Sequence, residues 1–177
     1  MIRITGGKHR SRKLETPDVL TTKPTMDKVR AAVFNILSDS IRDKKVLDLF
    51  AGSGSYGFEA LSRGALSVTF VDNNKDAINS IKKNASILNE TNINIINGDV
   101  ISYLSSSNER FNIVFADPPY KLELFNEILN LLGNNSLLGN NSIVVFESDK
   151  ELNLEETNNK KIKSYKYGLA RIYVIRY

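Results

Sequence analysis

The fold of this 177-residue chain is decided by the stretch Val46-Leu47-Asp48-Leu49-Phe50-Ala51-Gly52-Ser53-Gly54-Ser55-Tyr56-Gly57. Its first five residues are mostly apolar and predict a buried strand. The glycines that follow have the spacing G-x-G-x-x-G, which predicts a tight turn into a helix that ends near Arg63. A strand, a glycine turn and a helix in this order are typical of the start of a doubly wound α/β sheet.

Apolar runs and helical segments alternate after this stretch. Further strands are predicted over 67–72, 93–97, 111–117 and 142–147, separated by helices over about 75–89, 100–106 and 122–132. This alternation predicts right-handed βαβ units and a parallel sheet. The last two runs, 161–167 and 171–176, have no helix between them and predict a hairpin. We therefore expect a Rossmann-like α/β fold of the class I methyltransferase type. Its seven-stranded sheet is mostly parallel, with one antiparallel strand near the C-terminus.

Residues 1–40 precede this pattern and differ from it in charge. Short strands on either side of Gly6-Gly7 predict a β-ribbon, and apolar residues at helical spacing predict a helix over about 26–38. Residues 1–30 hold eight Lys and Arg against three Asp and Glu, whereas the whole chain has a net charge of +4. A basic segment of this kind favours binding to a polyanion. We predict an appendage over 1–40 and a single domain over 41–177.

Composition excludes several kinds of chemistry. The chain has no cysteine and a single histidine, His9, so it offers no disulfide, no thiolate nucleophile and no multi-histidine metal site. We expect no metal ion in the site.

No apolar run reaches the roughly 18 residues that a membrane span needs, and the N-terminus lacks a secretory h-region. These features predict a cytoplasmic protein that has no membrane partner.

Four aspartates recur at intervals of about one βα unit: Asp48, Asp72, Asp99 and Asp117. The carboxyl ends of parallel strands meet at one edge of a sheet, so three or four of these side chains are expected in one cleft. Asp99 could instead only cap a helix. Each pair of like charges about 5 Å apart costs about 3 kcal/mol at an effective dielectric of ~20, which disfavours a pyrophosphate ligand. The same field favours S-adenosylmethionine, which carries a sulfonium and an ammonium group.

The most specific motif is Asp117-Pro118-Pro119-Tyr120, at the end of the fourth predicted strand. Two prolines fix φ and remove two amide donors, so the turn is stiff and rich in acceptors. The Asp117 carboxylate and the Pro118 carbonyl can both accept hydrogen bonds from an exocyclic amine, and Tyr120 can stack on a base. Such positioning would direct the amine lone pair toward a methyl donor without a strong general base.

These motifs resemble those of a known family. The segments 48–54 and 117–120 look like the class I amino-methyltransferases that depend on S-adenosylmethionine. The RsmD family of bacterial 16S rRNA guanine-N2 methyltransferases is similar over nearly the whole chain. The similarity is carried by residues 4–14, 23–25, 29–37 and 59–65, with the segment Gly6-Gly7-Lys8-His9-Arg10-Ser11-Arg12-Lys13-Leu14 the most specific.

The resemblance implies roles for individual residues. The target guanine amine would be held by Asp117, Pro118, Pro119 and Tyr120. The cofactor would be bound by Asp48, Phe50, Ala51, Gly52, Ser53, Gly54, Asp72, Asn73, Asp99 and Val100. In this scheme Asp72 holds the ribose hydroxyls, and Asp99 with Val100 meets the adenine. RNA would be contacted by Arg3, Lys8, His9, Arg10, Arg12, Lys13 and Lys23.

The partner implied is 16S rRNA or an assembly intermediate of the 30S subunit, and we expect the protein to bind it as a monomer.

Two residues depart from the family pattern. Lys23 stands where arginine is more usual, and Tyr56 replaces a smaller residue after the glycine turn.

Other functions fit parts of the pattern. The Asp-Pro-Pro-Tyr motif also serves adenine-N6 methylation of DNA or RNA, although the chain shows no inserted target-recognition domain. A non-catalytic RNA-binding protein could use the same fold as a scaffold, but it would not need the acceptor cluster. An NAD-dependent oxidoreductase fits the glycine spacing but not a carboxylate-lined cleft.

Overall fold

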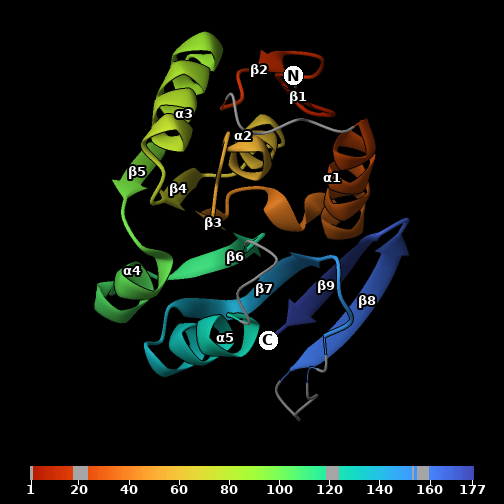
Figure 1. Cartoon of the computed structure of the whole chain (residues 1–177), viewed down its shortest axis with the longest axis vertical. Helices are drawn as coiled ribbons and strands as arrows, with labels where there is room; N and C mark the ends of the chain where they lie inside the picture. Colours follow the sequence, from red (N-terminus) through yellow and green to blue (C-terminus); the bar gives the residue numbers. More distant parts are fainter. Residues whose placement is uncertain (1, 18–23, 119–123, 153, 155–159) are drawn as a thin grey trace.

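Strand β3 (Lys45–Leu49) lies between β4 and β6 in a seven-stranded sheet whose order is β5-β4-β3-β6-β7-β9-β8 (Figure 1). The computed structural model describes residues 2–17, 24–118, 124–152, 154 and 160–177. The other strands of the sheet are β4 (Ser67–Asp72), β5 (Ile93–Asn97), β6 (Phe111–Ala116), β7 (Leu138–Ser148), β8 (Lys161–Tyr167) and β9 (Ala170–Arg176). Strand β9 pairs antiparallel with both β7 and β8, and the pairs among β3 to β7 are parallel. The predicted fold class is therefore confirmed.

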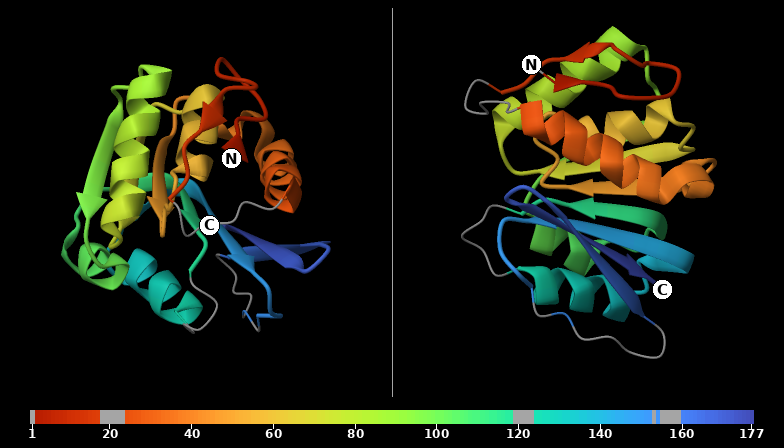
Figure 2. Two further views of the ribbon diagram at one scale, coloured as in Figure 1. Left: turned by 45° about the horizontal axis from the view of Figure 1, so that its top comes forward. Right: turned by 90° about the vertical axis from the view of Figure 1, so that its right-hand side faces the viewer.

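The sheet buries both of its faces, and the helices divide between them (Figure 2). Helices α1 (Pro24–Leu37), α2 (Ser55–Ser62) and α3 (Lys75–Leu88) pack on the face that includes Val46, Phe70 and Phe115. Helices α4 (Val100–Ser106) and α5 (Phe125–Asn134) pack on the face that includes Leu47 and Val114. Strands β3, β4 and β6 are covered on both sides, and most of their residues are buried, as is usual for parallel strands.

Most element boundaries fall within three residues of the prediction. Strand β7 is longer, beginning at Leu138 rather than at residue 142, because Leu138 already pairs with Phe111 before a register shift. A short 3-10 helix, η1 (Ser38–Ile41), follows α1 and was not predicted.

The strand order reverses beside β3, since β4 lies on one side of it and β6 on the other. A crevice outside the carboxyl ends of the strands at such a point is the usual ligand site of this fold.

The N-terminal ribbon consists of β1 (Ile2–Arg3) and β2 (Lys13–Leu14), paired antiparallel as predicted. Ile2, Ile4 and Leu14 are buried in the same apolar cluster as the α1, α2 and α3 side of the sheet. Figure 2 shows the ribbon lying across these helices. The ribbon therefore has a fixed place beside the glycine turn.

The described part of the chain contains no helix long and apolar enough to cross a membrane. Within the same residues, no three His, Cys, Asp or Glu side chains are grouped so that they could hold a metal ion.

Candidate active site

Asp48 occupies the centre of the site, inside β3 and only 3% exposed. Its Oδ2 accepts the backbone N–H of Gly57, at 2.9 Å, in the first turns of α2. Burial raises the pKa of Asp48 to about 8. The hydrogen bond from Gly57 lowers this pKa and the nearby charge of Asp72 raises it further. A buried carboxyl with one hydrogen bond is stabilised by a cation.

Asp72, at the end of β4, holds the glycine turn. Its Oδ2 accepts the N–H of Gly52 and its Oδ1 accepts the N–H of Asn74, both at 2.8 Å. The turn is conformationally strained, because Phe50 has a φ of 56° although it is not glycine. Such a conformation costs about 1–2 kcal/mol in an L-residue and is frequent at ligand sites. Asp72 therefore fixes the loop that is predicted to bind the cofactor, and its carboxylate has further lone pairs for a ligand.

Gly54 and Gly57 stand at positions where a larger residue would collide with aromatic side chains. A Cβ on Gly54 would lie 2.8 Å from Phe58, and one on Gly57 would lie 2.2 Å from Phe70. Both glycines therefore let α2 pack tightly on the sheet. Gly54 also has a φ of 76°, which favours glycine.

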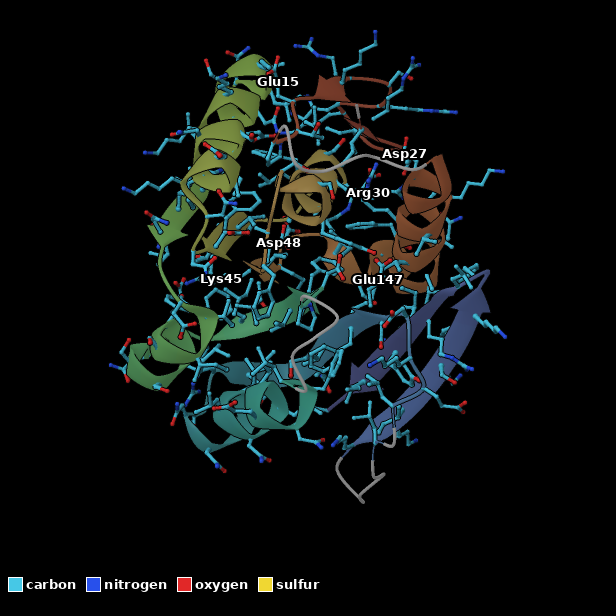
Figure 3. The ribbon with its side chains drawn as sticks, viewed as in Figure 1. Glu15, Asp27, Arg30, Lys45, Asp48 and Glu147 are labelled. Atoms are coloured by element: carbon cyan, nitrogen blue, oxygen red, sulfur yellow. The ribbon has the colours of Figure 1, made fainter. Side chains whose placement is uncertain are left out.

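Asp117 follows directly after β6, beside the carboxyl end of β3. Burial and the negative charges of Glu147 and Asp48 raise the pKa of Asp117 well above its usual value. Glu147 lies on β7, the strand next to β6. Asp48, Asp117 and Glu147 thus come from three adjacent strands and form one carboxyl cluster. Two of these residues, Asp48 and Glu147, are labelled in Figure 3. Pro118 is buried, whereas Pro119 and Tyr120 lie outside the described residues.

Asp99 lies at the N-terminus of α4, where its Oδ1 accepts the N–H of Ser102 at 2.8 Å. It is exposed, and the neighbouring Val100 is buried against the other face of the sheet. Asn73 is exposed after β4, and Ala51 and Ser53 are buried in the glycine turn. A capping role for Asp99 is compatible with the predicted contact to adenine, since a carboxylate has further lone pairs.

The glycine turn is also tied to the N-terminal segment. Asn84 of α3 is 0% exposed, and its Nδ2 donates to the carbonyls of Ser53 and Glu15, at 3.0 and 2.9 Å. Its Oδ1 accepts the N–H of Glu15 at 2.7 Å. One buried side chain therefore links the predicted cofactor loop to the end of the ribbon.

The basic residues of the ribbon divide into two groups. Lys8 and His9 contact the carboxylate of Glu90 at 2.8 and 2.7 Å, and Arg12 donates to the carbonyl of Ile87 at 2.7 Å. Arg3, Arg10 and Lys13 are exposed on the ribbon, and Lys23 lies outside the described residues. Arg3, Arg10 and Lys13 therefore offer cations to a ligand. Lys8, His9 and Arg12 also hold the ribbon beside α3.

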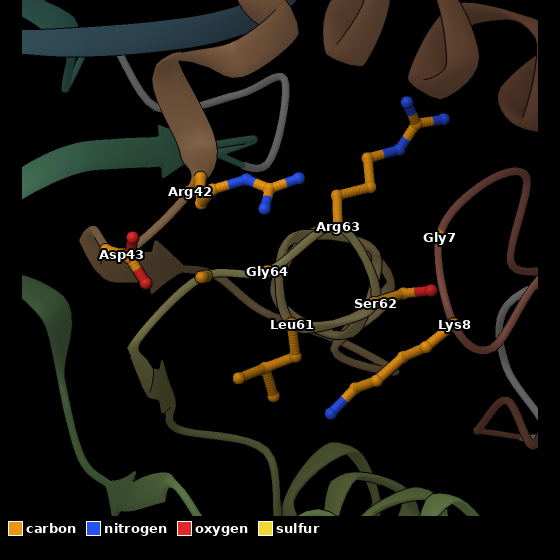
Figure 4. Close-up of a pocket in the computed structure, with 9 residues that line it drawn as sticks. Gly7, Lys8, Arg42, Asp43, Leu61, Ser62, Arg63 and Gly64 are labelled. Carbon is orange, nitrogen blue, oxygen red and sulfur yellow. The ribbon is translucent and has the colours of Figure 1, made fainter.

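A separate hollow of about 480 Å³ lies at the opposite edge of the sheet (Figure 4). Arg42 and Asp43 precede β3, and Gly64 and Ala65 precede β4, so this hollow adjoins the amino ends of the strands. Lys8 and Arg63 also line it. The hollow is therefore distinct from the carboxyl cluster.

Sequence reasoning missed two parts of the site. Glu147 ends the strand predicted over 142–147, just as Asp117 ends the strand predicted over 111–117. An acidic residue at the carboxyl end of a predicted strand was the signal used for the aspartates, and it would also have found Glu147. Asn84 gave no local signal, because its partners are 31 and 69 residues away in the chain.

The sequence of the chain is similar to those of known proteins. The family model described as conserved hypothetical protein 95 matches residues 2–176. Ribosomal RNA small subunit methyltransferase D of Escherichia coli (strain K12) is 40% identical over 150 residues, which cover 85% of this chain and 76% of the relative. The protein of the same name from Buchnera aphidicola subsp. Baizongia pistaciae is 34% identical, covering 95% of this chain and 90% of its own.

Solved structures agree with the fold. The Escherichia coli protein yhhF superposes with a TM-score of 0.88 at 35% identity, covering 99% of this chain and 97% of that chain. The Thermus thermophilus 16S rRNA N2 G1207 methyltransferase, solved with AdoMet and guanosine, shares the fold. Its TM-score is 0.71 at 18% identity, over 91% of this chain and 45% of that chain.

The carboxyl cluster and the glycine turn fit S-adenosylmethionine, because buried carboxyls are stabilised by its sulfonium and ammonium charges. The chain therefore belongs to the conserved hypothetical protein 95 family, which is the RsmD family of S-adenosylmethionine-dependent methyltransferases.

Proposed function

We propose that this enzyme transfers a methyl group from S-adenosylmethionine to the exocyclic N2 amine of a guanine in 16S rRNA. The observation that carries the proposal is the position of Asp117 at the end of β6, in one cluster with Asp48. This position supports a role for Asp117 as the acceptor for the amine, beside the residues that fit the cofactor. Support for the substrate comes from relatives at 34–40% identity that are named small-subunit ribosomal RNA methyltransferases.

The chain's residues would bind and orient both reactants. When bound, the cofactor supplies a methyl group on a positively charged sulfur. Phe50 to Gly54, held by Asp72, would line its methionine and ribose, with Asn73, Asp99 and Val100 toward the adenine. The Asp117 carboxylate and the Pro118 carbonyl would accept hydrogen bonds from the guanine amine, with Pro119 and Tyr120 completing the turn. Fixed acceptors of this kind typically contribute about 10²–10³ in rate.

RNA would bind along the N-terminal ribbon. Arg3, Arg10 and Lys13 are exposed there and would contact phosphates, each contact releasing counterions. Lys8, His9, Arg12 and Lys23 complete the proposed surface. We retain residues 1–40 as the RNA-binding part and 41–177 as the methyltransferase domain. The enzyme would act in the cytoplasm as a monomer, on 16S rRNA or on a 30S assembly intermediate.

Transfer of a labelled methyl group tests the proposal. The purified protein is incubated with labelled S-adenosylmethionine and with 16S rRNA, 30S particles or duplex DNA in parallel, and the product is digested to nucleosides. We expect label in N2-methylguanosine from the rRNA or 30S arm. Label in N6-methyladenosine, label in DNA only, or no transfer in any arm would overturn the proposal.

A further inference from the structure

Tyr56 has a defined place in the site. Its ring packs against Phe115 of β6 and Phe34 of α1, with centroids 5.0 and 6.2 Å away. Its hydroxyl donates to Oε2 of Glu147 at 2.8 Å. Burial and the charge of Glu147 raise the pKa of Tyr56 well above its usual value, so the hydroxyl remains a donor. Tyr56 therefore holds the Glu147 carboxylate from the side of α2.

Glu147 in turn lies beside Asp117. Ala116 of β6 pairs with Phe146 of β7 in parallel register, so the next residue of each strand follows at the same edge. The two carboxyls interact electrostatically, and each is buried from most of the solvent. Two like charges in such a position disfavour simultaneous ionisation, as in other carboxyl pairs that share one proton.

The groups around the pair decide which carboxyl keeps the proton. Burial raises the pKa of Glu147, while the hydrogen bond from Tyr56 on α2 and the charge of Arg30 on α1 lower it. Asp117 faces negative charge from Glu147 on β7 and from Asp48 on β3. On the remaining neighbour, β9, Glu147 is paired with Ile172, which has no charge. The hydrogen bond from Tyr56 and the charge of Arg30 therefore favour ionisation of Glu147, whereas two like charges disfavour ionisation of Asp117.

We propose that Tyr56 and Glu147 are positioning residues that act through Asp117. Tyr56 fixes the Glu147 carboxylate beside Asp117, and the charge of Glu147 favours transfer to Asp117 of the proton that the amine loses. This inference rests on the proposed function, since it assigns the amine to Asp117.

The proton balance is simple. As the new N–C bond forms, the C–S electron pair stays on sulfur, and the nitrogen becomes positively charged. One N–H proton must then leave for the neutral secondary amine to form. The step begins with Asp117 ionised, at a pH above its raised pKa, so that its carboxylate can accept this proton. The charge of Glu147 favours that protonation, and water takes the proton after product release.

The first experiment uses the free protein and is independent of the substrate. The side-chain carboxyl carbons are labelled with ¹³C, and their chemical shifts are followed against pH. The signals of Glu147 and Asp117 in the wild type should show two coupled steps, the lower from Glu147 and the upper from Asp117, apart from the step of Asp48, whose pKa burial also raises. Glu147→Gln should leave one step for Asp117, at lower pH than the upper wild-type step, because a repelling charge is gone. Tyr56→Phe should move the lower step to higher pH, because the ionised Glu147 loses its donor.

Matched controls remove similar groups elsewhere. Glu127→Gln changes an exposed glutamate of α5, and Tyr165→Phe removes the hydroxyl of a half-buried tyrosine on β8. Both should leave the two steps in place. An upper step that stays at its wild-type pH in Glu147→Gln would overturn the proposal, whatever the enzyme methylates.

The second experiment measures kcat against pH on the substrate identified by methyl transfer. With Glu147→Gln we expect kcat to fall about tenfold, its acidic limb to move to lower pH, and KM for S-adenosylmethionine to stay within about twofold. Tyr56→Phe keeps the ring and its packing, so it tests the hydroxyl if Glu147→Gln unfolds. An unchanged pH profile in both variants would refute the positioning role. Failure of the proposed function would appear separately, as no methyl transfer by the wild type.

Discussion

The carboxylate of Glu59 accepts both the N–H and the hydroxyl of Thr5, each at 2.7 Å, across 54 residues of chain. Glu59 lies on α2 and is 0% exposed. The same carboxylate contacts Arg63 at 2.8 Å and Arg30 at 3.4 Å. Arg30 also donates to Asp27 at 3.0 Å and to the carbonyl of Arg3. Glu59 is thus the buried anion that fastens the N-terminal ribbon and α1 to the domain.

Glu59→Gln should therefore destabilise the protein strongly. The substitution leaves the buried Arg30 without its buried counter-charge and turns one acceptor toward Thr5 into a donor. Breaking a buried ion pair in this way costs about 3–5 kcal/mol. Urea unfolding measures the change. Glu109→Gln, which removes an exposed partner of Lys45 at 3.5 Å, should cost at most about 1 kcal/mol. Equal midpoints for the two variants would contradict the role of Glu59.

Asn84→Ala should loosen the glycine turn. Removing its amide leaves the carbonyls of Ser53 and Glu15 and the N–H of Glu15 without their partner, at a cost of about 1–3 kcal/mol per unsatisfied buried group. Because Ser53 is in the cofactor loop, S-adenosylmethionine should bind more weakly, which calorimetry measures. Asn94→Ala, on the exposed face of β5, is the matched control. Wild-type affinity in Asn84→Ala would show that the loop does not need this tie.

The pH dependence of stability should change in Asp48→Asn. The pKa of Asp48 rises from 3.8 to about 8 on burial, so the folded state binds a proton that the unfolded state has lost between about pH 4 and 8. Stability from this group falls as pH rises through that window, by up to about 1.4 kcal/mol per pH unit. Asparagine keeps an acceptor for Gly57 but cannot ionise. Urea unfolding at several pH values should show a shallower decline in Asp48→Asn, and parallel curves would contradict this.

Asp117→Ala should fold normally and still bind S-adenosylmethionine, because the change removes a buried carboxyl that Glu147 and Asp48 repel. We expect methylation to fall by about 10²–10³. Methyl transfer under saturating cofactor measures this loss. Asp76→Ala, at an exposed aspartate in the first turn of α3, should retain wild-type activity. If Asp117→Ala methylates as fast as Asp76→Ala, Asp117 does not hold the amine.

Replacing two exposed cations of the ribbon should weaken RNA binding and flatten its salt dependence. Arg10→Ala with Lys13→Ala should reduce the slope of log K against log salt by about 1 for each phosphate that the variant no longer binds. Filter binding at several salt concentrations measures the slope. Lys163→Ala with Lys166→Ala, exposed on β8 at the far end of the sheet, removes the same charge. Equal slopes in the two double variants would place the RNA elsewhere.

Much of the fold could be predicted because its signals are local. Strands such as 67–72 and 93–97 are short apolar runs, and the helices between them repeat apolar residues every three or four positions. The end of α5 and the start of β7 were less well predicted. There a register shift after Phe111 lets β7 begin early, and no local pattern encodes a shift in the partner strand.

The candidate site was predictable where it depends on topology. Parallel strands bring their carboxyl ends to one edge, so Asp48, Asp72 and Asp117 could be placed together from their positions in the sequence. The roles proposed for individual site residues stay predictions. The contacts of Gly54 with Phe58 and of Gly57 with Phe70 were not predicted, because they depend on how α2 packs on the sheet.

The sequence alone therefore determined the order of strands and helices and the edge at which acidic side chains gather, because hydrophobic periodicity and βα topology act over short stretches of chain. Only the tertiary structure decided that Glu59 binds Thr5 and that Tyr56 donates to Glu147, 91 residues away. Such contacts depend on how α2 packs against the ribbon and the strand ends. No local pattern encodes that packing.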